Sequence, residues 1–70
     1  MDVKVTYHVN EVRVLKHLNL RDLASLSGVS RSEISNIENN LTDPTIRTLC
    51  LLSRALDVSP EELYSFEVIP

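Results

Sequence analysis

The chain has 70 residues, a formal net charge of −3, one glycine and one cysteine. This length fits one domain with a small core, and a single cysteine allows neither an intrachain disulfide nor a cysteine-based zinc site. One glycine excludes phosphate-binding loops, dinucleotide fingerprints and nucleophile elbows, and the two histidines have no metal-type spacing partner. The composition therefore predicts a protein that is not an enzyme and that needs no metal or cofactor.

The distribution of charge and hydropathy indicates which kinds of partner the protein can have. No apolar run reaches 18 residues and no export signal is visible, which predicts a cytoplasmic protein without membrane contact. Residues 13–54 carry six basic and four acidic side chains, whereas residues 55–70 carry four acidic and no basic ones. The acidity is thus concentrated at the C-terminal end, and the middle of the chain is slightly basic.

The first half of the chain predicts one strand and three helices. Residues 3–8 alternate apolar and polar side chains, as a half-buried strand does, and helical periodicity starts near Val9. Asn19 is a suitable N-cap for a helix over 20–27, and Gly28 ends that helix where a positive φ is needed. Ser30 and Glu33 predict a capping box for a helix over 30–39.

The second half predicts two more helices. Asp43 and Pro44 are typical of an N-cap and a first helical position, and we expect the Cys50 thiol in the core face of this fourth helix. Ser59 and Pro60 start a short fifth helix. The tail 66–69 alternates weakly, so the two ends pair as short β-strands, within one chain or across a dimer, or alternatively remain frayed. The prediction is an all-α domain of five helices, with short terminal strands as an addition.

One group of residues, between positions 23 and 37, indicates a function. Ala24 and Gly28 suit a close crossing of two helices through a tight turn, and apolar residues at 23, 29, 34 and 37 face inward. The side chains left facing outward from the second helix are short or planar hydrogen-bonding groups. Such groups suit the reading of base edges in a DNA major groove. They are Arg31, Ser32, Ser35 and Asn36.

These residues carry a family resemblance. The stretches LASLSGVSRSEISNIEN and DPTIRTLCLLSRALDVSPEEL resemble the Cro/C1-type helix-turn-helix domains, also called the xenobiotic-response-element family. The match covers about residues 9–64 of a single domain over 1–70, with 1–8 and 65–70 as terminal extensions. The resemblance implies a lambda-repressor-like fold in which the helix over 30–39 is the recognition helix.

The resemblance also implies roles for individual residues. Arg31, Ser32 and Asn36 match base-contacting positions, and Ser35 lies on the same face. Asn39 matches a position that touches phosphate, while Arg13 and Glu38 match a structural salt bridge. Basic residues that flank the motif are further phosphate candidates, namely Arg21 and Arg47. Leu20 departs from the family, which commonly has glutamine there to hold a phosphate.

The predicted function is that of a sequence-specific transcriptional regulator that binds double-stranded DNA as a homodimer, without a small-molecule ligand. Dimer candidates are Leu51, Val58 and Tyr64. The alternative is a protein-interaction module of the same fold, antitoxin-like or regulator-binding, with weak or no DNA binding. The acidic total and Leu20 favour this alternative, whereas Arg31, Ser32 and Asn36 count against it.

Overall fold

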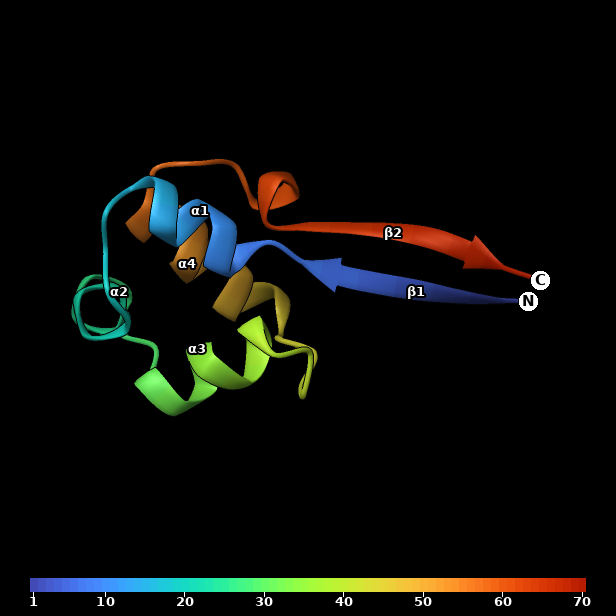
Figure 1. Cartoon of the computed structure of the whole chain (residues 1–70), viewed down its shortest axis with the longest axis horizontal. Coiled ribbons are helices and arrows are strands. Elements are labelled where there is room, and N and C mark those ends of the chain that lie inside the picture. The colour runs from blue at the N-terminus through green and yellow to red at the C-terminus, as the bar shows by residue number, and fades with distance from the viewer.

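The computed structural model describes all 70 residues and shows a helical body from which a two-stranded ribbon extends (Figure 1). Both termini lie at the far end of the ribbon, and the molecule measures 39 Å along its longest axis against 21 and 20 Å along the others. In chain order the elements are β1 (Asp2–Tyr7), α1 (Val9–Leu15), α2 (Leu20–Ser27), α3 (Arg31–Glu38), α4 (Ile46–Leu56), the 3₁₀ helix η1 (Pro60–Leu63) and β2 (Tyr64–Ile69).

The core is a single cluster of apolar side chains that joins all four α-helices and η1. On helix α4, Leu49, Leu52 and Leu56 recur three and four residues apart. They therefore lie on one face of the helix, and this face is buried in the core. Each fully buried side chain of this size stabilises the fold by roughly 1.5–3 kcal/mol. The remaining members of the cluster are Val9, Leu23, Val29, Ile34, Ile37 and Leu63.

Two local motifs set the boundaries of α2. Asn19 forms a capping box with Asp22: its side chain accepts from the Asp22 N–H at 2.7 Å, and its own N–H donates to the Asp22 carboxylate at 3.2 Å. Gly28 follows the helix with φ at +79°, as predicted. The left-handed residue turns the chain sharply, so that α3 begins three positions later against α2.

The starts of α3 and α4 differ from the prediction. Ser30 caps α3 by accepting from the Glu33 N–H at 3.1 Å, but the Glu33 carboxylate accepts from Thr48 Oγ1 at 3.3 Å instead of closing a capping box. Helix α4 begins at Ile46 with Thr45 as its N-cap, and not at Asp43 and Pro44. The Asp43 carboxylate accepts from the Tyr7 hydroxyl at 2.7 Å, so a tertiary contact takes the side chain that was predicted to cap the helix.

The prediction of five helices is wrong. The segment Pro60–Leu63 forms one 3₁₀ turn, because Leu63 reaches the core at once and the following residues continue as β2. The two ends pair as antiparallel strands, with Val3 opposite Val68 and Val5 opposite Phe66. The architecture is four α-helices, a 3₁₀ turn and a two-stranded sheet. Cys50 is exposed rather than buried, since it lies one position away from the buried stripe of α4.

Candidate nucleic-acid interface

The N-terminal ends of α2 and α3 meet at one end of the helical body, away from the ribbon. An open hollow between them is lined mostly by polar side chains. They are Asn19, Leu20, Arg21, Ser30, Arg31, Ser32 and Ser35. Because the first N–H groups of each helix lack partners within the helix and carry partial positive charge, the hollow combines helix ends and guanidinium groups suited to anions.

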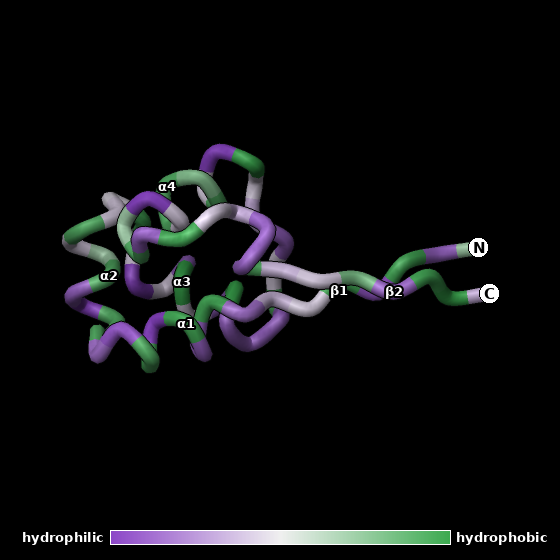
Figure 2. The backbone as a smooth tube through the Cα atoms, turned by 90° about the horizontal axis from the view of Figure 1, so that it is seen from above, coloured by the Kyte–Doolittle hydropathy of each residue, from purple (hydrophilic) through white to green (hydrophobic).

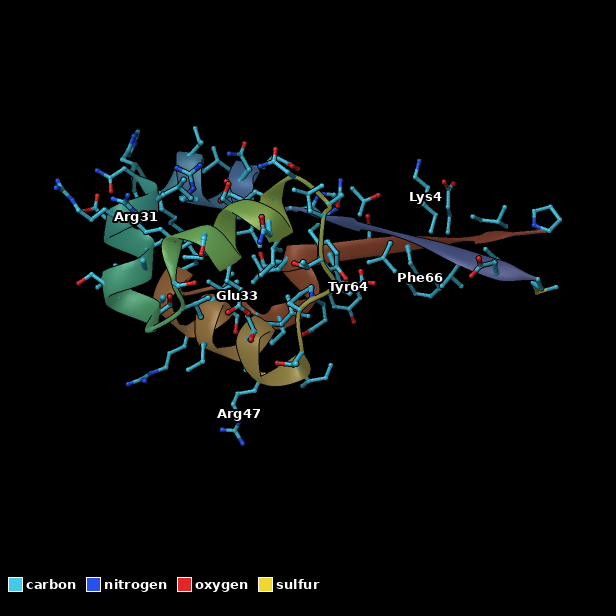
Figure 3. The ribbon with its side chains drawn as sticks, turned by 90° about the horizontal axis from the view of Figure 1, so that it is seen from below. Lys4, Arg31, Glu33, Arg47, Tyr64 and Phe66 are labelled. Atoms are coloured by element: carbon cyan, nitrogen blue, oxygen red, sulfur yellow. The ribbon has the colours of Figure 1, made fainter.

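The outward side of α3 carries the four side chains expected at base edges. Arg31 and Ser32 are exposed, and Ser35 and Asn36 are half-buried. The Arg31 guanidinium takes part in neither of the salt bridges of the chain and in none of its side-chain hydrogen bonds. In Figure 3 it points away from the helical body, at the opposite end of the molecule from Phe66. Its donors are therefore available to another molecule.

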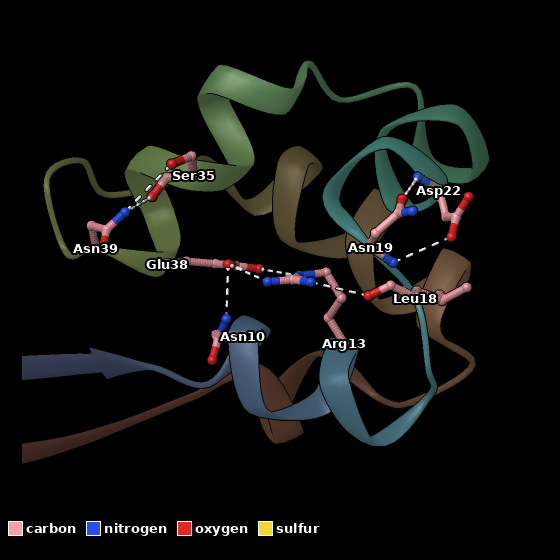
Figure 4. Close-up of polar contacts among 8 residues, drawn as sticks. All are labelled: Asn10, Arg13, Leu18, Asn19, Asp22, Ser35, Glu38 and Asn39. Atoms are coloured by element: carbon pink, nitrogen blue, oxygen red, sulfur yellow. Dashed lines mark hydrogen bonds and ion pairs between the residues drawn. The ribbon is translucent and has the colours of Figure 1, made fainter.

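Ser35 and Asn39 interact with each other at the C-terminal end of α3. The Asn39 side-chain amide donates to the Ser35 carbonyl at 2.9 Å and reaches Ser35 Oγ at 3.4 Å (Figure 4). Asn39 is exposed at the same time. A phosphate at this position would therefore compete with Ser35 for the donors of the amide.

The structure brings Arg13 and Glu38 together in a nearly buried salt bridge between α1 and α3. Arg13 Nε donates to Glu38 Oε2 at 2.8 Å and Nη2 donates to Oε1 at 3.0 Å, while Nη1 donates to the Leu18 carbonyl at 3.0 Å (Figure 4). The two side chains are only 13% and 7% exposed, and the hydrogen bond to Glu38 raises the pKa of Arg13 above its ordinary value. Arg13 thus holds α3 in place, because each of its three side-chain nitrogens already donates a hydrogen bond within the chain.

The three basic residues of the predicted interface are not adjacent to one another. Arg21 and Arg31 line the hollow at the helix N-termini, whereas Arg47 is exposed near the start of α4. Figure 3 shows Arg47 and Arg31 pointing in different directions from the helical body. Two of the three cations therefore concentrate at one place, and the third lies on a separate part of the surface.

The candidate dimer residues have different environments. Leu51 and Val58 are half-buried and pack against the core, which leaves little of either side chain for a partner. Tyr64 begins β2 and is 36% exposed. Of the three, Tyr64 presents the most accessible surface, and it does so at the base of the ribbon.

Two contacts at the base of the ribbon had no signal in the sequence. The Tyr7 hydroxyl donates to Asp43, which lies in the loop between α3 and α4, and His8 Nε2 lies 2.8 Å from Ser65 Oγ. Burial, then the hydrogen bond to Asp43 and the charge of that carboxylate, raise the pKa of Tyr7 to about 12. These contacts join the ribbon to the helical body and to the loop that follows α3.

No group of three or more histidine, cysteine, aspartate or glutamate side chains converges in the way that a metal site requires. None of the helices combines the length and the apolar character that crossing a membrane would demand. The hollow between α2 and α3, together with the outward side of α3, forms the candidate site.

Comparisons with known proteins agree on one class. An uncharacterised HTH-type transcriptional regulator of Mycobacterium tuberculosis is 38% identical over 56 residues, which are 80% of this chain and 40% of the relative. The control protein C.SmaI of Serratia marcescens is 32% identical over 65 residues, 90% of this chain and 77% of the relative. The chain thus spans well under half of the mycobacterial relative and most of C.SmaI. The relatives are regulators rather than enzymes.

Solved structures with a similar fold belong to the same class of protein. The restriction-modification controller protein C.AhdI of Aeromonas hydrophila superposes with a TM-score of 0.76 at 33% identity, covering 79% of this chain and 83% of that one. The controller C.Esp1396I, solved as a tetramer in complex with its natural 35 base-pair operator, gives 0.69 at 37% identity, covering 73% and 67%. A family model described as helix-turn-helix matches residues 9–63. The chain belongs to the Cro/C1-type helix-turn-helix family of transcriptional regulators.

Proposed function

We propose that the chain is a sequence-specific regulator that binds double-stranded DNA, with α3 in the major groove. The observation that carries the proposal is the outward side of α3, where Arg31 is exposed and unpaired beside Ser32, Ser35 and Asn36. Arginine binds the O6 and N7 atoms of guanine with two hydrogen bonds, and the asparagine amide does the same with adenine. Serine hydroxyls accept or donate and fit either base.

The framework around α3 supports the same proposal. The Gly28 turn and the Arg13–Glu38 salt bridge hold α3 at a defined angle against α2 and α1. The N-terminus of α2 would approach the phosphate backbone with its free N–H groups, beside Arg21. Leu20 contributes no polar side chain there, so this contact would depend on the backbone and on Arg21. Asn39 and Arg47 are the further phosphate candidates.

We further propose that the protein acts as a homodimer in the cytoplasm. Two copies related by a twofold axis would place their α3 helices in successive major grooves, about 34 Å apart. C.Esp1396I binds its operator as a tetramer, so assembly on DNA occurs among proteins similar to this one. A dimer doubles the number of base contacts that one small domain can make.

Selection of bound sequences from a pool of random duplex DNA tests the proposal. The expected result is an enriched operator with two related half-sites whose centres are about 10 base pairs apart, or a multiple of that spacing. An absence of enrichment at low salt would contradict DNA recognition and favour the protein-interaction module as the function.

Substitution of Arg31 by alanine tests the role of this side chain. Loss of a bidentate guanine contact should weaken binding to the selected operator by about 1–3 kcal/mol and relax the preference at one base pair of each half-site. The matched control is Arg54→Ala, which removes an exposed arginine from α4. Equal weakening on every DNA sequence would instead assign Arg31 to a phosphate.

A further inference from the structure

The ribbon has one apolar and one mostly polar face. The strand register places three pairs, Val3 with Val68, Val5 with Phe66 and Tyr7 with Tyr64, on the same side, because cross-strand partners share a face and alternate residues share it along a strand. We call these six residues the apolar ribbon face. The other side carries Lys4 opposite Glu67 and Thr6 opposite Ser65. Figure 3 shows Lys4 and Phe66 projecting from opposite sides of the ribbon, and Figure 2 shows the alternation in hydropathy along the strands.

No part of the helical body covers the outer part of the apolar ribbon face. Phe66 is 62% exposed, Val68 is 56% exposed and Val3 is 49% exposed, and none of the three packs against the core. Together the six side chains expose on the order of 500 Å² of mostly apolar surface, which is as large as the largest patch of a typical monomer. A two-stranded ribbon without a covering layer is only marginally stable in water. The outer part of the face is therefore suited to a partner.

We propose that the partner is a second copy of this chain, and that the apolar ribbon face is the dimer interface. The face carries no ionisable group other than the two tyrosine hydroxyls, so two copies related by a twofold axis meet without repulsion between like charges. Two such faces bury on the order of 1,000 Å² in total, which reaches the lower limit of specific protein interfaces. The polar face, with its Lys4 and Glu67 pair, remains in solvent.

The position of the ribbon suits this role. It extends from the end of the body opposite Arg31, so the interface leaves the hollow and the outward side of α3 free (Figure 3). A strand of this length spans about 20 Å. Two ribbons packed face to face and pointing in opposite directions would therefore keep the two helical bodies apart, at the two ends of the interface. This inference rests on the proposed function for its DNA geometry, but the dimer itself is measurable without DNA.

A fluorescent variant provides the direct test. The chain has no tryptophan, so Phe66→Trp introduces a single reporter on the apolar ribbon face. We expect its emission to shift to shorter wavelength as the protein concentration rises, in step with the mass measured by sedimentation equilibrium. The control is Leu41→Trp, which places the reporter at another exposed apolar position outside the ribbon and should show no such shift. Dimerisation with an unchanged Phe66→Trp spectrum would overturn the proposal.

A pair of neighbouring substitutions provides the second test. Val68 and Ile69 are adjacent on β2 and both are exposed, but they belong to opposite faces. We expect Val68→Ser to weaken dimerisation by roughly 10-fold or more, because each dimer loses two buried valines, whereas Ile69→Ser should leave it unchanged. Far-ultraviolet circular dichroism and the melting temperature at low concentration report whether both variants keep the fold.

Other results would place the dimer interface elsewhere or assign the apolar ribbon face to a different protein. If Ile46→Asp on α4 dissociates the dimer and Val68→Ser does not, the interface is on α4 and the proposal is overturned. A wild-type protein that stays monomeric at high concentration without DNA also overturns it, and the face then serves a different protein. Neither result affects the selection of operators, so a failure of this inference is distinguishable from a failure of the proposed function.

Discussion

At the scale of single residues, the chain divides its charged groups between structure and surface. Arg13 is fixed between Glu38 and the Leu18 carbonyl, whereas Arg31 and Arg21 have no partner of opposite charge within the chain. The buried pair positions α3, and the free cations face solvent at the hollow. Residue type alone does not separate these roles, because the same guanidinium group serves both.

Removal of one member of the salt bridge should be costly. Arg13→Met leaves Glu38 almost buried, with Asn10 as its one remaining side-chain donor, so we expect the free energy of unfolding to fall by about 2–3 kcal/mol. Urea unfolding measures the change. The double variant Arg13→Met/Glu38→Met should cost less than the sum of the two single changes, since no unpaired charge is left. Additive losses would show that the two side chains are not coupled.

Tyr7 should titrate far from its ordinary range. Its pKa is raised from 10.0 to about 12, so between these two values the folded state binds more protons than the unfolded state. The stabilisation is fully present below pH 10 and is lost as the pH rises towards 12. In Tyr64→Phe, where Tyr7 is the remaining tyrosine, the absorbance change at 295 nm should have its midpoint near pH 12. A midpoint near 10 in a protein that is still folded would contradict the contact with Asp43.

At the scale of elements, short helices depend on their ends. None of the four α-helices exceeds 11 residues, so each relies on capping and on core contacts rather than on its own helical propensity. Four turns use a left-handed residue, and only Gly28 among them is a glycine. The other three carry a side chain at positive φ, at His17, Asn40 and Asp57.

A substitution at the C-terminal end of α4 should stabilise the protein. Asp57 lies at φ +56° and places a negative charge at the negative end of the helix dipole. Asp57→Gly removes both disadvantages and should raise the free energy of unfolding by about 0.5–1 kcal/mol. Asp57→Asn removes the charge alone and should fall between wild type and glycine. A destabilised glycine variant in urea unfolding would show that the aspartate makes a stabilising contact.

At the scale of the whole molecule, two of the seven basic residues gather at one place. Arg21 and Arg31 line the hollow at one end of the helical body, whereas Lys4 and Glu67 face each other on the ribbon at the other end. The net charge of −3 therefore does not describe the surface that we propose for DNA. It does predict weak binding to DNA of arbitrary sequence, because long-range attraction to phosphate is small.

The salt dependence of operator binding should be shallow. If Arg21 and Arg47 contact one phosphate each, a dimer neutralises four phosphates, and the slope of log K against log salt should be about −4. Fluorescence anisotropy between roughly 50 and 200 mM salt measures it. Arg21→Ala should reduce the slope by about 2 per dimer, whereas Lys4→Ala on the ribbon should leave it unchanged. A slope near −10 would contradict this small number of phosphate contacts.

Local patterns in the sequence were sufficient to predict most of the helical body. Asn19 as a cap, Gly28 at positive φ and the apolar spacing of Ile34 and Ile37 depend on interactions within a few residues, and these predictions are confirmed. The outward side of α3 follows from the same periodicity, because residues that are not on the buried stripe of a helix face solvent. The family could be recognised for the same reason, since its motif is a set of short-range spacings.

Contacts between distant parts of the chain decided the features that local patterns did not predict. Asp43 accepts from Tyr7 instead of capping α4, and Glu33 accepts from Thr48 instead of completing a capping box, because both carboxylates find tertiary donors. The pairing of the two chain ends into one ribbon likewise depends on where α1 and η1 leave the helical body. A carboxylate and a strand each have several partners of similar free energy, and the folded backbone determines which of them lies within reach.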